Sequence, residues 1–385
     1  SRRGELLDAL AALARGEEAP GLVTGTARED TGRTVFVFPG QGSQWAGMGR
    51  DLYQTSPVFR THLDTCAQAL DPHTGWNLVN TLTGTDDTWL HHVDTVQPAL
   101  FATMVALAQT WRTYGIEPDA VIGHSQGEIA AAHIAGALTL DDAARIVTLR
   151  SRTLKTLAGT GGMTSINLPA THVQELLTTN NWHHHLTIAA HNGPTNTIVA
   201  GTPQALDTLT THCEHHNIRA RRIPVDYASH SPHIEPLHHH LTTLLADINP
   251  QPTTHIAFYS TLTNTHIHDT TTLNADYWYE NLRRPVQFEA TTRTLLANGH
   301  TTYIETSPHP VLTTSIQETA EHTTTHTTTI PTLRRDHGTL THLLTNLAHA
   351  HTTTNTPINW TPHHPTNPTP TNLPTYPFQH QHYWL

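Results

Sequence analysis

The fold of this chain is decided by Asp119-Ala120-Val121-Ile122-Gly123-His124-Ser125-Gln126-Gly127, which places a serine between two glycines. The first four residues predict a short buried strand, and the small apolar residues at 128–135 predict a helix. The glycines permit a sharp turn between the two, which exposes the serine hydroxyl at its apex. Ser125 is therefore the candidate nucleophile. The alternative is a chance G-x-S-x-G in an ordinary loop, and the flanking elements argue against it.

Length and composition limit the class of protein. The chain has 385 residues, of which 36% are apolar, and threonine and histidine crowd its second half. This length suffices for one large domain and a smaller one, or for two domains with linkers, and the firmer core is expected in the first half. The formal charge is -11 with the 34 histidines counted neutral. That acidic balance disfavours nucleic acid as a partner.

Cysteine usage and hydropathy indicate where the protein works. Cys66 and Cys213 are the only cysteines, and their spacing indicates neither a disulfide framework nor a metal pair. The longest apolar helical stretch, near 129–138, is far shorter than the ~18 to 20 residues that span a bilayer. We therefore expect a cytoplasmic protein with no membrane segment. The N-terminal stretch has no cleavage site and no initiator methionine, so we expect a piece of a longer chain.

The order of predicted elements indicates an α/β domain that begins near residue 33. Residues 34–38 predict a buried strand that stops at Pro39-Gly40. Helical patterns at 57–70 and 98–114 alternate with short strands as far as the serine turn, which favours a parallel sheet covered by helices. Strand patterns at 256–260 and 302–305 are expected to rejoin that sheet.

The order of predicted strands and helices changes at Gly161, which indicates an inserted subdomain. The predicted order is strand, helix, strand, strand, helix, strand, at 163–168, 170–178, 186–190, 197–200, 203–215 and 219–225. A βαββαβ order is typical of a ferredoxin-like arrangement. We therefore expect a compact subdomain between the two halves of the large sheet.

The C-terminal part and the histidine clusters carry less information. A helix is predicted at 338–351, and the Pro/Thr/Asn run at 362–377 is expected to lie extended on a surface before the aromatic residues at 376–384. The triple histidines at 183–185 and 238–240 have no acids or cysteines at ligand spacing. We therefore predict no metal site, and the threonine-rich tract 323–329 is taken as surface bias.

A glycine loop follows the first predicted strand, at Phe38-Pro39-Gly40-Gln41-Gly42-Ser43-Gln44-Trp45. It is no nucleotide loop, because Trp45 stands where a dinucleotide fingerprint needs glycine and no Gly-Lys-Ser/Thr follows. This loop, the serine turn and Tyr227-Ala228-Ser229-His230-Ser231 together resemble the acyltransferase domain of modular type I polyketide synthases. That family is related to the malonyl-CoA:acyl carrier protein transacylases. Further matches are at 192–194, 285–288, 307–310 and 373–378, so the resemblance covers almost the whole chain.

The resemblance implies a domain plan. An α/β-hydrolase-like core with a parallel sheet would occupy 33–160 and 226–332, and the ferredoxin-like subdomain would occupy 161–225. Residues 1–32 would end the linker from an upstream ketosynthase, and 333–385 would form the linker after the acyltransferase. Covalently linked neighbouring synthase domains are therefore expected partners.

Ser125 needs a base, because a serine hydroxyl is a weak nucleophile at neutral pH. The resemblance assigns this role to His230. His124 is the alternative, but neighbouring side chains at a tight turn point in different directions. The family has no triad acid, so the resemblance implies that a backbone carbonyl near the Pro-Val-Gln-Phe segment, at Gln287, orients the imidazole.

The resemblance also implies how the oxyanion and the substrate are bound. The backbone N–H groups of Gln41 and Gln126 would form the oxyanion hole. Arg150 lies 25 positions after the serine and matches the family arginine that binds the free carboxylate of a malonyl-type acyl group, for which a planar guanidinium is well suited.

Three positions indicate the choice of acyl group. The segment 92–97, ending in Gln97, resembles the upstream methylmalonyl signature, except that Thr95 stands where valine is commoner. Gln126 replaces an aliphatic residue, and Tyr227-Ala228-Ser229 replaces the malonyl-type His-Ala-Phe. The smaller Ser229 would leave space for the substrate methyl group.

The expected reaction loads methylmalonyl-CoA onto Ser125 and transfers the acyl group to the phosphopantetheine thiol of an acyl carrier protein. It needs no bound cofactor, since the CoA thioester is the substrate. Two alternatives remain open at the level of sequence. One is a serine hydrolase or editing thioesterase that uses the same serine turn, and the other is a docking segment without activity.

Overall fold

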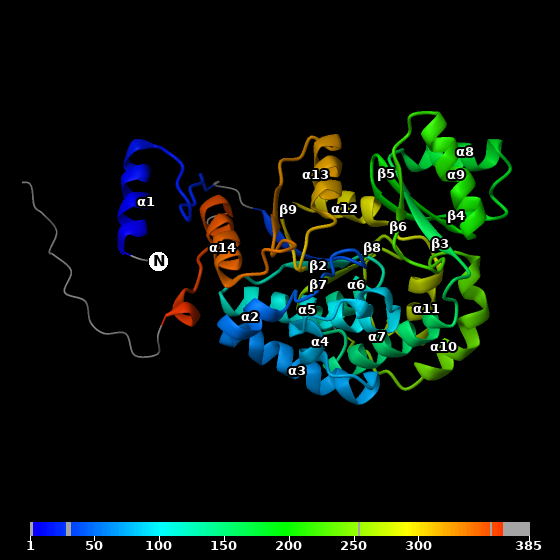
Figure 1. Cartoon of the computed structure of the whole chain (residues 1–385), viewed down its shortest axis with the longest axis horizontal. Helices are drawn as coiled ribbons and strands as arrows, with labels where there is room; N and C mark the ends of the chain where they lie inside the picture. Colours follow the sequence, from blue (N-terminus) through cyan, green and yellow to red (C-terminus); the bar gives the residue numbers. More distant parts are fainter. Residues whose placement is uncertain (1–2, 28–31, 253–254, 355, 365–385) are drawn as a thin grey trace, which may run out of the picture.

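The computed structural model describes residues 3–27, 32–252, 255–354 and 356–364. The predictions made for the Pro/Thr/Asn run beyond residue 364 and for the aromatic residues at 376–384 lie outside these residues. Figure 1 shows a large sheet with helices on both faces, a smaller sheet with its own two helices at one side, and α1 (Arg3–Arg15) with α14 (Leu340–Thr354) at the other.

The large sheet has six strands in the order β10-β9-β1-β2-β7-β8. All neighbours are parallel except β8, which pairs with β7 in the antiparallel sense. The α/β class with a parallel sheet is thus confirmed. The strands are β1 (Arg33–Phe38), β2 (Ala120–Gly123), β7 (Ala257–Ser260), β8 (Thr265–His266), β9 (His300–Glu305) and β10 (Thr328–Pro331).

Both faces of this sheet are buried, which explains why its central strands are almost continuously apolar. Alternate residues of β1 enter two different cores: Phe36 and Phe38 on one face, Val35 and Val37 on the other. The two faces are covered by different partners. Helices α3, α5, α6 and α7 cover the first, while α12, α13 and the small sheet share the core of the second.

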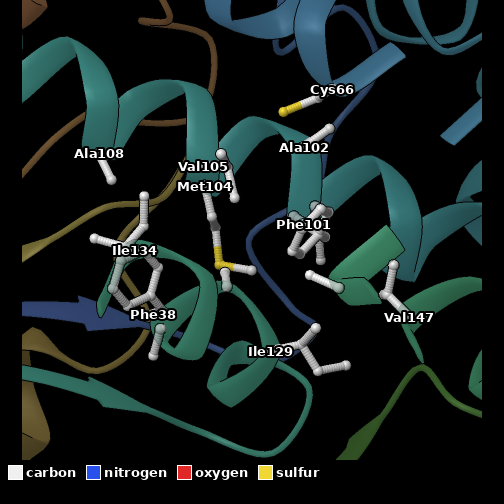
Figure 2. Close-up of a cluster of buried hydrophobic side chains, with 14 of the residues drawn as sticks. Phe38, Cys66, Phe101, Ala102, Met104, Val105, Ala108, Ile129, Ile134 and Val147 are labelled. Atoms are coloured by element: carbon white, nitrogen blue, oxygen red, sulfur yellow. The ribbon is translucent and has the colours of Figure 1, made fainter. Parts of the chain in front are cut away.

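Helix α5 (Val93–Thr113) is the centre of the larger core, with sixteen buried residues. Figure 2 shows its residues Phe101, Met104 and Val105 among side chains from the first strand, α6 and α7. Packing on several sides fixes the helix that follows the serine turn. The helices around it are α2 (Arg50–Thr55), α3 (Pro57–Thr74), α4 (Leu78–Thr83), η1 (Thr88–His91), α6 (Gly127–Ala135) and α7 (Leu140–Lys155).

The small sheet is antiparallel, with strand order β4-β5-β3-β6, and its two helices bury a separate core. This is the βαββαβ order expected from the sequence. The elements are β3 (Gly162–Ile166), α8 (Ala170–Thr179), β4 (Leu186–Gly193), β5 (Asn196–Gly201), α9 (Pro203–His215) and β6 (Ala220–Ile223).

The second half of the chain is more ordered than its composition suggested. The tract 323–329 was taken as surface bias, but Thr328 and Thr329 begin edge strand β10, where β-branched threonine is well suited. Other helices there are η2 (Pro232–Leu237), α10 (His238–Leu244), η3 (Thr270–Thr272), α11 (Ala275–Arg283), α12 (Phe288–Ala297), α13 (Thr313–His322) and η4 (Thr361–His363). No helix in the described ranges has the length and apolar character needed to cross a membrane.

Candidate active site

The serine turn joins β2 to α6 and holds Ser125 in a left-handed backbone conformation, with φ 55°. Two close approaches require the glycines around it. A Cβ on Gly123 would lie 2.2 Å from the backbone nitrogen of Glu128, and one on Gly127 would lie 2.0 Å from the carbonyl oxygen of Phe38. Local strain of this kind persists only where the surroundings enforce it. The turn therefore presents Ser125 in one fixed position.

His230 meets this serine from a segment 105 residues further along the chain. Its Nε2 lies 2.8 Å from Ser125 Oγ, and its Nδ1 donates to the carbonyl of Arg284 at 2.8 Å. That second bond makes Nε2 the acceptor of the pair. Burial and the nearby Arg150 charge lower the pKa of His230 to about 3, so the imidazole is neutral at pH 7. The arrangement allows it to take the serine proton.

The carbonyl that orients His230 is not that of Gln287, so this prediction is wrong. The Gln287 carbonyl accepts from the backbone and hydroxyl of Thr291 at 3.0 and 2.8 Å, because it begins α12. The preceding Val286 is bonded to the small sheet through Ala189 and His191. The motif thus joins the two sheets, and the orienting carbonyl comes from the end of α11, three residues earlier.

His124 is in a different position from the one a base would need. Its Nε2 lies 2.8 Å from the side-chain oxygen of Asn192, and its ring packs near Phe288. Burial lowers its pKa. It lines the cavity next to Ser125, but the serine hydroxyl is bonded to His230 instead.

The two predicted oxyanion residues lie close to the serine: Gln126 follows it in the chain, and Gln41 follows Gly40, on which a Cβ would lie 3.9 Å from Ser125 Cβ. Among the described residues, no acceptor is bonded to the backbone N–H of Gln41 or of Gln126, and both residues line the cavity. The side-chain oxygen of Gln41 accepts from Gln97 at 3.1 Å and from the hydroxyl of Tyr227. Two residues predicted to select the substrate therefore also hold an oxyanion residue.

Arg150 is a buried cation that forms no ion pair with a carboxylate of the described residues, although the charge of the buried Glu128 partly opposes the lowering of its pKa. The residue is 0% exposed, and one of its terminal nitrogens donates to Ser125 Oγ at 3.3 Å. Its Nε and Nη1 have no partner within the described residues. Burial lowers its pKa to about 10, which leaves it charged at pH 7. An unpaired buried guanidinium is costly, so the site favours an anionic ligand.

These groups surround a cavity of about 140 Å³ between the large domain and the small sheet. Ser125, His230, Arg150, Gln41, Gln97, Gln126, Tyr227 and Ser229 all line it. Ala228 does not, because it packs into the core beneath, against Gly161. The structure thus places Ala228 behind the cavity wall, because consecutive side chains of this segment point in different directions, and its role in selectivity stays a prediction.

Sequence reasoning missed several residues of the cavity. Met163 of β3 faces Ser229, whose hydroxyl lies 3.7 Å from the methionine sulfur, and Ile198, Ile223 and Val225 extend this apolar wall. They belong to the small sheet or follow it, and no local pattern marks them as site residues. In the described ranges, no three histidine, cysteine or acidic side chains gather in a way that could hold a metal ion.

Comparisons with known proteins show the family to which this chain belongs. A family model described as an acyl transferase domain matches residues 35–357. The polyketide synthase GfsE of Streptomyces halstedii is 49% identical over 99% of this chain and 10% of its own length. The erythronolide synthase EryA3 of Saccharopolyspora erythraea is 46% identical over 100% of this chain and 12% of its own. The chain thus spans about a tenth of these relatives.

Solved structures give the same result. The acyltransferase domain from module 8 of the salinomycin polyketide synthase is 48% identical, with a TM-score of 0.88, over 92% of this chain and 83% of that one. The malonyl CoA-acyl carrier protein transacylase of Coxiella burnetii is 23% identical, with a TM-score of 0.72, over 85% of this chain and 99% of that one. The second likeness is one of fold alone.

Proposed function

Because the chain belongs to the acyl transferase domain family, we propose that it transfers methylmalonyl units from CoA to a carrier protein through an acyl-serine. One observation carries this proposal. Ser125 Oγ lies 2.8 Å from the neutral His230 imidazole and 3.3 Å from the guanidinium of Arg150, whose Nε and Nη1 have no hydrogen-bond partner among the described residues. A nucleophile with a base and a buried cation is suited to an acyl thioester that carries a second, free carboxylate.

In the first half-reaction, Ser125 Oγ attacks the thioester carbon while His230 Nε2 takes the hydroxyl proton. The oxygen that becomes negative lies toward the N–H groups of Gln41 and Gln126, and one such donor typically stabilises the transition state by about 2.7 to 4 kcal/mol. The carbon–sulfur bond then breaks. CoA leaves as the thiol with the proton held by His230, and Ser125 keeps the acyl group as an ester.

In the second half-reaction, the phosphopantetheine thiol of an acyl carrier protein takes the place of CoA. His230 removes the thiol proton, sulfur attacks the serine ester, and the proton returns to Ser125 Oγ as the ester bond breaks. The guanidinium of Arg150 binds the free carboxylate in both halves. No metal or redox step is needed for this exchange.

The walls of the cavity support methylmalonyl as the acyl group. Ser229 is small, and an apolar wall of Met163, Ile198 and Val225 offers a place for a methyl group. One methyl group in such a pocket discriminates by only about 1 to 3 kcal/mol, so we expect a preference rather than strict exclusion.

The setting of the reaction is also proposed. The relatives are about ten times longer than this chain, which supports neighbouring synthase domains and an acyl carrier protein as partners. Cys66 and Cys213 are both buried and free, which fits a reducing cytoplasm. The proposed domain plan has linkers to neighbouring domains at 1–32 and 333–385 and the inserted subdomain at 161–225.

A competition between acyl-CoA thioesters tests the proposed selectivity. The protein is offered equal amounts of malonyl-, methylmalonyl- and ethylmalonyl-CoA, and the acylated species are resolved by intact mass. We expect methylmalonyl to be the main adduct. A main adduct of malonyl would contradict the selectivity, and release of free acid at the same rate with and without carrier protein would indicate a hydrolase.

A further inference from the structure

We propose that Glu128 is a positioning residue that holds the helix carrying the partners of His230 at a fixed distance from Ser125. The inference rests on the proposed function only in taking His230 as the base. Glu128 follows the nucleophile by three residues, is 0% exposed, and does not line the cavity. It is a buried carboxylate that the acyl-transfer mechanism leaves unused.

Four hydrogen bonds are donated to this carboxylate. On one oxygen, the backbone N–H and the hydroxyl of Thr261 donate at 2.5 and 2.6 Å. On the other, the hydroxyl of Tyr277 donates at 2.6 Å and the amide of Asn281 at 2.9 Å. Burial raises the pKa of Glu128, and all four bonds oppose that rise. Four donors therefore favour the ionised form, in which both oxygens accept.

The last two donors belong to α11, where residues four apart share one face. Helix α11 ends at Arg283, and its end supplies both backbone acceptors of His230. The carbonyl of Leu282 accepts from the His230 backbone N–H at 2.8 Å, and that of Arg284 accepts from Nδ1 at 2.8 Å. Glu128 is thus bonded to the helix that sets the ring orientation and the tautomer of the base.

The other end of this connection is the serine turn itself. Glu128 lies in the first turn of α6, and its backbone N–H donates to the carbonyl of Ser125 at 3.0 Å. The Thr261 hydroxyl also lies 3.0 Å from the carbonyl of Gly123. One carboxylate therefore connects the segment that carries the nucleophile with the helix that holds the base.

This connection matters because neither catalytic segment determines the position of the other. His230 has φ 58° and lies in an irregular segment between β6 and η2. Without the carboxylate, the buried ends of Tyr277 and Asn281 lose an acceptor, and α11 can shift relative to α6. A displacement of about 1 Å in a reacting group can cost about a hundredfold in rate.

The test is Glu128→Gln in the full chain, which keeps the shape of the side chain but replaces one acceptor oxygen with a donor. We expect the rate constant for loading Ser125 to fall by about 10- to 100-fold, with KM for the thioester within about twofold of native. Glu117→Gln is the matched control, because Glu117 is an exposed carboxylate that pairs with Arg112. It should load at the native rate.

A second readout separates this inference from the proposed substrate. Methanesulfonyl fluoride has no carboxylate for Arg150 to bind. Its sulfur forms a bond to Ser125 Oγ, fluoride leaves, and the serine proton passes to His230. We expect Glu128→Gln to slow this reaction by the same factor as loading. If the native chain reacts with this reagent but accepts no malonyl-type thioester, the proposed function fails while the positioning role is still measured.

Tyr277→Phe covers the case in which Glu128→Gln does not fold. It removes one hydroxyl from α11, and we expect about a fivefold loss of rate at an unchanged KM. Native rates with both reagents in a folded Glu128→Gln variant, or in Tyr277→Phe where that variant is unfolded, would overturn the proposal. A change in KM alone would overturn it too, because it would place the effect on substrate binding.

Discussion

The two catalytic residues come from regions of very different construction. Ser125 stands between a strand and a helix that are buried in the main apolar core, and close backbone approaches fix its turn. His230 stands in an irregular segment and is held by carbonyl oxygens at the end of α11. Both have positive φ, at 55° and 58°. The backbone strain at Ser125 is therefore enforced by local packing, while that at His230 is enforced by hydrogen bonds to residues distant in the sequence.

We expect the largest loss of activity from His230→Ala, which removes the proposed base. We expect the loading rate constant to fall by about 10²- to 10⁴-fold, because the Ser125 proton loses its acceptor. Stopped-flow or quenched-flow loading, read by intact mass, measures it. His233→Ala serves as the histidine control, because His233 is three residues further along the chain and does not line the cavity, and this variant should load at the native rate. A loss below tenfold would indicate another base.

The cation between the two regions is tested by Arg150→Ala. The activation free energy for loading methylmalonyl should rise by about 3 to 5 kcal/mol, as expected when a buried charge loses its partner. Loading from acetyl-CoA should fall much less. Arg152→Ala is the matched control, since Arg152 is exposed, donates to the His73 carbonyl and does not line the cavity. Equal losses with both thioesters would contradict the carboxylate-binding role.

We also expect Arg150→Ala to change the pH dependence of kcat/KM. Burial and the Arg150 charge both lower the pKa of His230, to about 3, and the neutral form is the active one. Activity should therefore be lost only as the pH falls toward that value. Without Arg150 the pKa rises, so the acid limb of the kcat/KM profile for acetyl-CoA moves to higher pH. An unmoved limb would argue against this coupling.

The prediction of smallest effect concerns the wall that the two regions share. Tyr227→His with Ser229→Phe should raise malonyl loading relative to methylmalonyl by about 1 to 3 kcal/mol, because phenylalanine fills the space for the methyl group. The competition assay measures the ratio. Tyr227 also donates to Gln41, so Tyr227→His alone separates loss of this contact from the effect of volume. An unchanged ratio in the double variant would refute the volume argument.

The sequence predicted the Ser125 region better than the His230 region, and for a physical reason. The strand, the turn and α6 are contiguous, and their apolar pattern with glycines states the local geometry directly. The orienting carbonyl was placed at Gln287 but belongs to Arg284. A backbone carbonyl has no side-chain signature, so only the position of α11 reveals which one reaches the imidazole.

Amino-acid composition was a poor guide to structure in the second half of the chain, where tertiary contacts determine which segments are ordered. The threonine-rich second half contains α12, whose threonine hydroxyls donate to backbone carbonyls one turn earlier, and β10, whose threonines lie in an edge strand. Glu128 is another case, because a glutamate after a serine turn looks like an ordinary charge of a first helical turn. Its partners Tyr277 and Asn281 lie about 150 residues away, and no local pattern joins them.

We propose that these two regions form one covalent acyl-transfer centre at Ser125. Intact-mass analysis of the native chain and of Ser125→Ala, each incubated with methylmalonyl-CoA, tests it most directly. We predict one methylmalonyl adduct on the native chain and none on the variant. A full adduct on Ser125→Ala would contradict the assignment, because another residue would then carry the acyl group.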